Sequence, residues 1–246
     1  MQDADSMRRF SRLEAEQAEG IVIVIDVMRA FTVAAYAFAG GASSLWLVRT
    51  PEEALALREL DPAALLAGEI GGRLIPGFDI NNSPFLVSQA DLRGKRLIQR
   101  TGAGTQGAVG ARNATHLLIC SLTNARATAR YAASLRQQTG LPIAFVPTEM
   151  SDERVQRNED SYCADYIEAL LTAPETAATV LAERIARLYA EGRFAHWGAE
   201  KDQDFPVEDM EKILAVDCFD FVMRGTRQES SGLMYVDVER QDDYLL

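Results

Sequence analysis

The chain has 246 residues, of which 48% are hydrophobic and 25% charged, a composition typical of one globular domain with a large buried core. Its formal net charge of -11 argues against a nucleic-acid-binding protein, which would carry a basic stripe for phosphates. The three cysteines form no CxxC pair, so neither a disulfide framework nor a zinc site is indicated. The longest apolar run, residues 21–25, is far shorter than the roughly 20 residues that span a bilayer, and no secretory signal precedes it. We therefore expect a cytoplasmic protein with no membrane and no nucleic-acid partner.

Apolar runs alternate with helical patterns along residues 21–146. The run at residues 21–25 predicts a fully buried strand, because it is short, continuous and β-branched. A helix start is predicted at Thr50-Pro51-Glu52-Glu53, where a capping hydroxyl precedes proline and two acids. The other predicted strands cover residues 44–48, 64–67, 96–99, 117–120 and 143–146, and the other predicted helices cover residues 32–39, 84–90, 105–113 and 124–138.

This alternation predicts an α/β fold of three layers, α/β/α, around a mostly parallel or mixed sheet. After Pro147 the pattern shifts to helices at about residues 159–172 and 175–190, followed by strands at 219–223 and 233–238. We expect an N-terminal extension over residues 1–20 and one catalytic domain over residues 21–246. Two lobes dividing near residues 147–158 are compatible with the change of pattern.

The loop from Gly68 to Ser83 is the most informative segment for function. It places two carboxylates, two amides and four glycines between apolar runs. A connection of this length inside a compact domain is uncommon unless it binds something. The loop therefore predicts a binding or catalytic role, with Glu69, Asp79, Asn82 and Ser83 as its chemically useful residues.

Polar residues also follow several predicted strands. Ligands of open parallel sheets bind beyond the carboxyl ends of the strands, so these residues are candidates for one common site. Asp26 and Arg29 follow the first strand. The later strands are followed by further candidates: Glu69, Arg100, Thr101, Gly104, Thr105, Ser121 and Asn124.

A glycine-rich turn at residues 102–107 has the spacing GxGxxG. Three interpretations stay open: an anion site formed by backbone N–H groups at a helix start, a tight turn, and a dinucleotide site. The last lacks the acid that normally ends the following strand, because that strand ends in Cys120-Ser121.

Together these motifs resemble the 2-phosphosulfolactate phosphatase family, the ComB-like proteins. The resemblance covers roughly residues 21–240, and its most specific block is Gly77-Phe-Asp79-(x)-Asn81-Asn82-Ser83-Pro84. The acidic pair Glu159-Asp160 and the block at residues 219–222 are similar to later motifs of the family.

The resemblance implies a Mg²⁺-dependent phosphatase that hydrolyses the phosphate ester of 2-phosphosulfolactate, or of a related small phosphorylated acid, to 3-sulfolactate, a step toward coenzyme M. It also supplies most of the expectation of a homo-oligomer. Phosphate-ester hydrolysis requires charge neutralisation, hard oxygen ligands for the metal and a positioned nucleophile. The expected catalytic residues are Asp26, Arg29, Glu69 and Asp79; the metal ligands Asp26, Glu69, Asp79 and Asp160; and the substrate contacts Asn82, Ser83, Arg100, Thr101, Gly104, Thr105, Ser121 and Asn124.

The residues leave the mechanism and two other functions open. Asp26 fits either a nucleophile or a ligand of a metal that activates water, although the Asp-x-Asp motif of haloacid-dehalogenase-type phosphatases is missing because position 28 is Met28. The chain is also compatible with an anion-binding protein of this family without turnover, and with a dinucleotide-dependent enzyme that uses the turn at Gly102.

Overall fold

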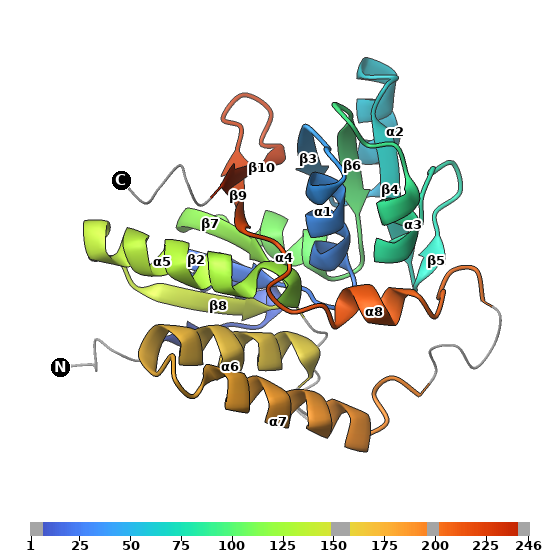
Figure 1. Cartoon of the computed structure of the whole chain (residues 1–246). Helices are drawn as coiled ribbons and strands as arrows, with labels where there is room; N and C mark the ends of the chain where they lie inside the picture. Colours follow the sequence, from blue (N-terminus) through green and yellow to red (C-terminus); the bar gives the residue numbers. More distant parts are fainter. Residues whose placement is uncertain (1–6, 149–157, 196–201, 241–246) are drawn as a thin grey trace.

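The structure, a computed structural model, describes residues 7–148, 158–195 and 202–240. It contains one ten-stranded sheet with helices packed around it (Figure 1). The strands are β1 (Arg8–Arg9), β2 (Gly20–Ile25), β3 (Ser44–Leu47), β4 (Leu65–Ile70), β5 (Arg73–Leu74), β6 (Arg96–Arg100), β7 (Ala114–Cys120), β8 (Ile143–Pro147), β9 (Phe221–Arg227) and β10 (Met234–Arg240). The helices are α1 (Ala30–Ala39), α2 (Pro51–Leu60), α3 (Pro84–Gln89), α4 (Gly104–Gly110), α5 (Ala125–Thr139), α6 (Glu159–Thr172), α7 (Ala177–Ala190) and α8 (Asp209–Ile213), with short 3-10 turns η1 (Arg12–Gln17) and η2 (Leu122–Asn124).

The predicted α/β class and every predicted strand and helix are confirmed, with shifts of a few residues at their ends. The helix start at Thr50 has the predicted chemistry, since its side chain accepts from the backbone N–H of Glu53 and the Glu53 carboxylate accepts in return. Residues 8–17 were expected to belong to an extension, but β1 pairs with β8 and η1 packs on α4. They are therefore part of the domain. The expected lobe boundary falls largely on residues 149–157, outside the described residues.

The sheet has the order β1-β8-β2-β7-β9-β10-β3-β6-β4-β5. Strands β1, β8, β2 and β7 form one parallel block, and β3, β6 and β4 form another. The hairpin β9–β10 joins them through three antiparallel pairings, so the two blocks run in opposite directions. In Figure 1, β2, β7 and β8 run across the view whereas β4 and β6 run upright.

Helix α1 lies in the hydrophobic cluster that connects the blocks. Eight of its residues are buried, and the same cluster includes Val24 of β2 and Leu45 of β3. The opposite face of β2, with Ile23, packs on α5 and α6. Helix α2 covers the outer face of the second block. Within the described ranges, no helix combines the length and apolar character needed to cross a membrane.

Candidate active site

A cavity of about 250 Å³ lies where the loops after β2, β4 and β6 meet, and we call it the Asp26 cavity. Direct contacts join these loops: Arg29 donates to the carbonyl of Gly72 at 3.3 Å, and the Glu69 carboxylate accepts from the backbone N–H of Gly102 at 2.6 Å. Its lining consists of Asp26, Met28, Arg29, Glu69, Gly72, Asn82, Thr101, Ala103, Arg193 and Phe205.

Asp26 follows β2 directly and is only 4% exposed. Its Oδ1 accepts the backbone N–H of Ala30 at 2.9 Å, which holds the carboxylate at the start of α1. Burial raises the pKa of Asp26 to about 6, with smaller contributions in the same direction from the negative charges of Glu159 and Glu69. Hydrogen bonds from Ala30 and Thr148 oppose this rise in pKa. The pKa shift reflects the free-energy cost of keeping this carboxylate ionised.

Thr148, at the end of β8, connects Asp26 to Asp160. Its Oγ1 lies 3.2 Å from Oδ2 of Asp26 and 3.4 Å from Oδ2 of Asp160. A hydroxyl has one hydrogen, so it donates to one of these carboxylates at a time. Asp160, at the start of α6, also accepts the backbone N–H of Val27 at 2.7 Å. Two carboxylates sharing one hydroxyl favour a proton or a cation between them.

Glu69, on β4, provides the second carboxylate of the cavity lining. Its Oε1 accepts from the N–H of Gly102, and its Oε2 accepts from the N–H of Gly72 at 2.7 Å. In the described part of the chain, neither Glu69 nor Asp26 forms an ion pair with a basic side chain. Their negative charge is therefore available to a cationic ligand.

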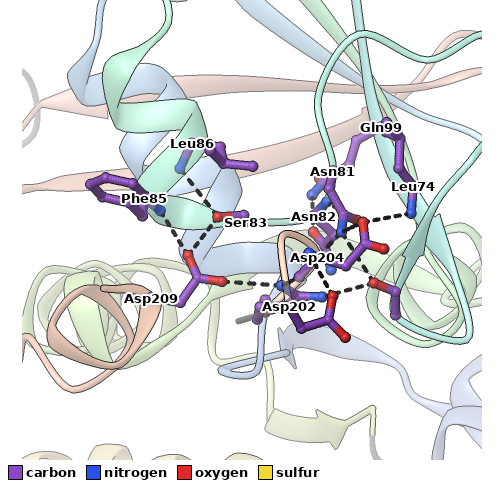
Figure 2. Close-up of polar contacts among 12 residues, drawn as sticks. Leu74, Asn81, Asn82, Ser83, Phe85, Leu86, Gln99, Asp202, Asp204 and Asp209 are labelled. Atoms are coloured by element: carbon purple, nitrogen blue, oxygen red, sulfur yellow. Dashed lines mark hydrogen bonds and ion pairs between the residues drawn. The ribbon is translucent and has the colours of Figure 1, made fainter. Parts of the chain in front are cut away.

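Arg29 is buried and already well bonded. Its Nη1 donates to Oδ2 of Asp209 at 3.0 Å and to the carbonyl of Asp204 at 2.7 Å, and its guanidinium stacks on the Phe205 ring at 4.6 Å. Burial lowers the pKa of Arg29, and the charge of Asp209 opposes this effect. Asp209 in turn accepts from the Ser83 hydroxyl at 2.6 Å (Figure 2). Arg29 thus joins the loop after β2 to the segment before α8.

The segment that carries Asp204 is attached to the loop after β4. The Asn81 amide donates to Oδ1 of Asp204 at 2.6 Å, and the backbone N–H of Leu74 donates to the same atom at 3.1 Å (Figure 2). A Cβ at Gly72 would lie 2.2 Å from the Phe205 ring. Glycine at position 72 therefore allows Phe205 to form one wall of the cavity.

Arg193 forms another wall of the cavity. Its Nε and Nη2 each donate to the Glu159 carboxylate at 2.8 Å, a two-point ion pair. Glu159 is buried at the start of α6, beside Asp160. The two residues of the predicted acidic pair therefore have different environments. Glu159 pairs with Arg193, whereas Asp160 lies beside the hydroxyl of Thr148.

Several predicted site residues lie outside the cavity lining. Asp79 forms an ion pair with Arg58 and accepts the backbone N–H of Leu66 at 2.7 Å. Arg100 donates to the carbonyls of Glu69 and Arg49 at 2.7 and 3.2 Å. Both side chains hold the loops of the second block together rather than line the Asp26 cavity.

The predicted hydroxyl and amide ligands divide in the same way. Asn82 and Thr101 line the cavity. Ser83 caps α3 by accepting the backbone N–H of Leu86. Ser121 and Asn124 are fully buried. The Asn124 side chain accepts the backbone N–H of Ser121, and the Ser121 hydroxyl accepts the backbone N–H of Thr123. The Thr105 hydroxyl accepts the backbone N–H of Thr101, and the Thr101 hydroxyl accepts the backbone N–H of Thr105.

The glycine-rich turn is explained by close packing. A Cβ at Gly104 would lie 2.7 Å from Oδ2 of Asp26, and a Cβ at Gly107 would lie 2.6 Å from Thr148. These glycines let α4 approach Asp26, so a dinucleotide is not needed to account for them.

The sequence interpretation missed Arg193, Phe205, Asp209 and Thr148. Thr148 follows a predicted strand and belonged among the residues inspected at strand ends. The other three lie after α6, where no strand end indicated a site. Within the described ranges, no three His, Cys, Asp or Glu side chains form a metal-binding group.

Comparison with known proteins shows the family of the chain. The model of the 2-phosphosulpholactate phosphatase family matches residues 8–224. The chain belongs to this family. All ten residues that line the Asp26 cavity fall within the matched range. The predicted family and the enzyme class, phosphoric monoester hydrolase, are confirmed.

Individual proteins of this family are also similar to the chain. A Bacillus subtilis protein named "Probable 2-phosphosulfolactate phosphatase" is 41% identical over 168 residues, which cover 68% of this chain and 70% of the relative. Proteins with the same name from Deinococcus radiodurans and Thermus thermophilus are 43% and 42% identical. Those alignments cover 62% and 47% of this chain, and 62% and 48% of the two relatives.

Proposed function

We propose that the chain is a Mg²⁺-dependent phosphatase that hydrolyses 2-phosphosulfolactate, or a closely related phosphorylated hydroxy acid, to the hydroxy acid and phosphate. The observation that carries this proposal is the chemistry of the Asp26 cavity. Asp26 and Glu69, two carboxylates that form no ion pair with any of the described residues, line it together with Arg29 and Arg193. A phosphorylated anion enters such a cavity favourably only when a cation offsets the carboxylates.

The oxygen donors around Asp26 suit Mg²⁺. This ion prefers hard oxygen ligands, keeps several waters and is commonly held by one or two carboxylates plus substrate phosphate. Asp26 and Asp160, which share the Thr148 hydroxyl, would hold it, so a closed cluster of three acids is not required. When bound, Mg²⁺ supplies charge neutralisation for the phosphoryl oxygens.

The remaining lining residues have roles that follow from their chemistry. Arg29 and Arg193 supply positive charge toward the phosphoryl or sulfonate group. Glu69 would accept the proton of an attacking water. Asn82 and Thr101 offer neutral hydrogen bonds that orient the substrate, and the Phe205 ring excludes water.

Release of inorganic phosphate tests this function. We expect turnover of 2-phosphosulfolactate with Mg²⁺ and its loss with EDTA. Phospholactate, which lacks the sulfonate, is the matched substrate, and a lower kcat/KM for it would show that the cavity recognises the sulfonate. Equal rates on both substrates would assign the cavity to phosphorylated hydroxy acids in general.

A further inference from the structure

A second cavity, of about 420 Å³, shares no lining residue with the Asp26 cavity. It lies between the end of β3, helix α2, the end of α4 and the hairpin β9–β10. Part of its wall is apolar and includes Leu57, Val109 and Leu233. We call it the arginine cavity because three arginines, Arg49, Arg112 and Arg227, also line it.

The three arginines have no acidic partner among the described residues. Arg227 donates to the carbonyls of Gly232 and Val109 at 2.8 and 2.7 Å, which fixes its guanidinium. Glu53 also lines the cavity, but its carboxylate accepts the backbone N–H groups of Arg49 and Thr50 at 2.7 and 3.2 Å. The carboxylate is thus engaged in capping α2 and does not pair with a guanidinium.

Keeping three like charges together costs free energy. Burial lowers the pKa of Arg227, and the positive charges of Arg112 and Arg49 lower it further. A neighbouring cavity of about 360 Å³ shares Arg49 and Arg112 and adds Arg12 and one acidic residue, Glu16. In a chain with a net charge of -11, this concentration of arginines forms a local positive field.

We propose that the arginine cavity is a second ligand site, which binds a small organic anion with an apolar body. Its phosphate or carboxylate head lies against Arg49, Arg112 and Arg227, because guanidinium groups bind both kinds of head through paired hydrogen bonds. Its apolar body packs on Leu57 and Val109. An anion in this position offsets the repulsion among the arginines, and the apolar wall distinguishes an organic ligand from inorganic phosphate.

Arg112 is the position to change in a test. It is exposed, and its side chain forms no hydrogen bond or ion pair among the described residues, so its substitution should leave the fold intact. Arg49 is less suitable because it is half-buried. Arg93, an exposed arginine paired with Asp91, is the matched control.

The probes are phenylphosphonate, benzoate and inorganic phosphate, titrated calorimetrically into the full chain with EDTA present. Without a cation, the carboxylates of the Asp26 cavity disfavour an anion there. We expect R112Q and R112E to weaken phenylphosphonate binding at least fivefold, R93Q to leave it unchanged, and inorganic phosphate to bind more weakly than phenylphosphonate. The phenylphosphonate and benzoate arms distinguish the two head groups. Undiminished binding in R112E, or no binding of either aromatic anion at millimolar concentration, would overturn the proposal.

Discussion

Replacing Asp26 by asparagine should stabilise the metal-free protein while removing its activity. The carboxylate is almost fully buried, and burial raises its pKa from 3.8 to about 6. An asparagine keeps the local hydrogen bonds, because its oxygen can accept from Ala30 and its NH₂ can donate to Thr148. The hydroxyl of Thr148 is then available to Asp160. The substitution therefore removes the cost of the charge without leaving a polar group unsatisfied.

The size of this effect follows from the shift in pKa. A rise of about two pKa units corresponds to about 3 kcal/mol of unfolding free energy, at roughly 1.36 kcal/mol per unit. Because the folded state binds the proton more tightly than the unfolded state, wild-type stability falls as pH rises from about 4 to about 6 and the deficit stays constant above that range. The Asp26→Asn variant does not lose stability in this way, because it has no carboxylate to ionise at this position. Its advantage should be below about 1 kcal/mol at pH 4.0 and about 3 kcal/mol at pH 7.5.

Urea unfolding in EDTA at these two pH values measures the difference. In a thermal melt at pH 7.5, the variant should unfold roughly 6–12 °C above the wild type. The control is Asp79→Asn, which removes a carboxylate that pairs with Arg58 and should give no gain. Equal or lower stability of Asp26→Asn at pH 7.5 would refute the reasoning that this carboxylate is held ionised at a cost.

Four further substitutions test the contacts in and around the cavity. Arg29→Lys should retain some substrate binding but lose much of kcat, since an ammonium lacks the planar two-point contact with phosphoryl oxygens; steady-state kinetics with unchanged kcat would limit Arg29 to binding. Asp209→Asn should lower the unfolding free energy by about 3–5 kcal/mol, because it removes the buried ion pair between Asp209 and the guanidinium of Arg29; unchanged urea midpoints would contradict this. Gly72→Ala should lower kcat/KM by displacing the ring of Phe205, and wild-type kinetics would show that this ring does not shape the site. Asp79→Ala should leave the Mg²⁺ titration unchanged, because the carboxylate lies outside the cavity lining; weaker Mg²⁺ activation would return it to the metal site.

The elements of the fold were predictable because their signals are local. Residues 21–25 are apolar on both sides of the strand, and the structure buries one side against α1 and the other against α5 and α6. The helix start at Thr50 is encoded in four adjacent residues. Such patterns depend on burial and capping, which the sequence displays directly.

The arrangement of the strands was not predictable in the same way. Hairpin β9–β10, formed by the last described strands, inserts between β7 and β3 and reverses the second parallel block. Each strand pattern is the same whichever way its neighbours run, so no local signal reveals this insertion. The strand ends nevertheless meet around the Asp26 cavity, because Arg29, which follows β2 of the first block, donates to the carbonyl of Gly72, which follows β4 of the second block.

The sequence predicted site residues mainly where they follow a predicted strand, because ligands bind beyond the carboxyl ends of parallel strands. Asp26, Glu69 and Thr101 line the cavity as that rule suggests. Ser121 and Asn124 also follow a strand, but their side-chain oxygens accept backbone N–H groups of the next turn. A sequence shows which side chains are able to bind a ligand, whereas competition from local backbone groups decides which remain available.

The most direct test of the account is phosphate release from 2-phosphosulfolactate by wild-type protein and by Asp26→Asn, each titrated with Mg²⁺. We expect wild-type turnover to rise saturably with Mg²⁺, to disappear in EDTA and to return when Mg²⁺ is restored. The Asp26→Asn variant should remain folded and show no such rise. Turnover that is independent of Mg²⁺, or a variant with wild-type activity, would contradict the assignment of the Asp26 cavity as the phosphatase site.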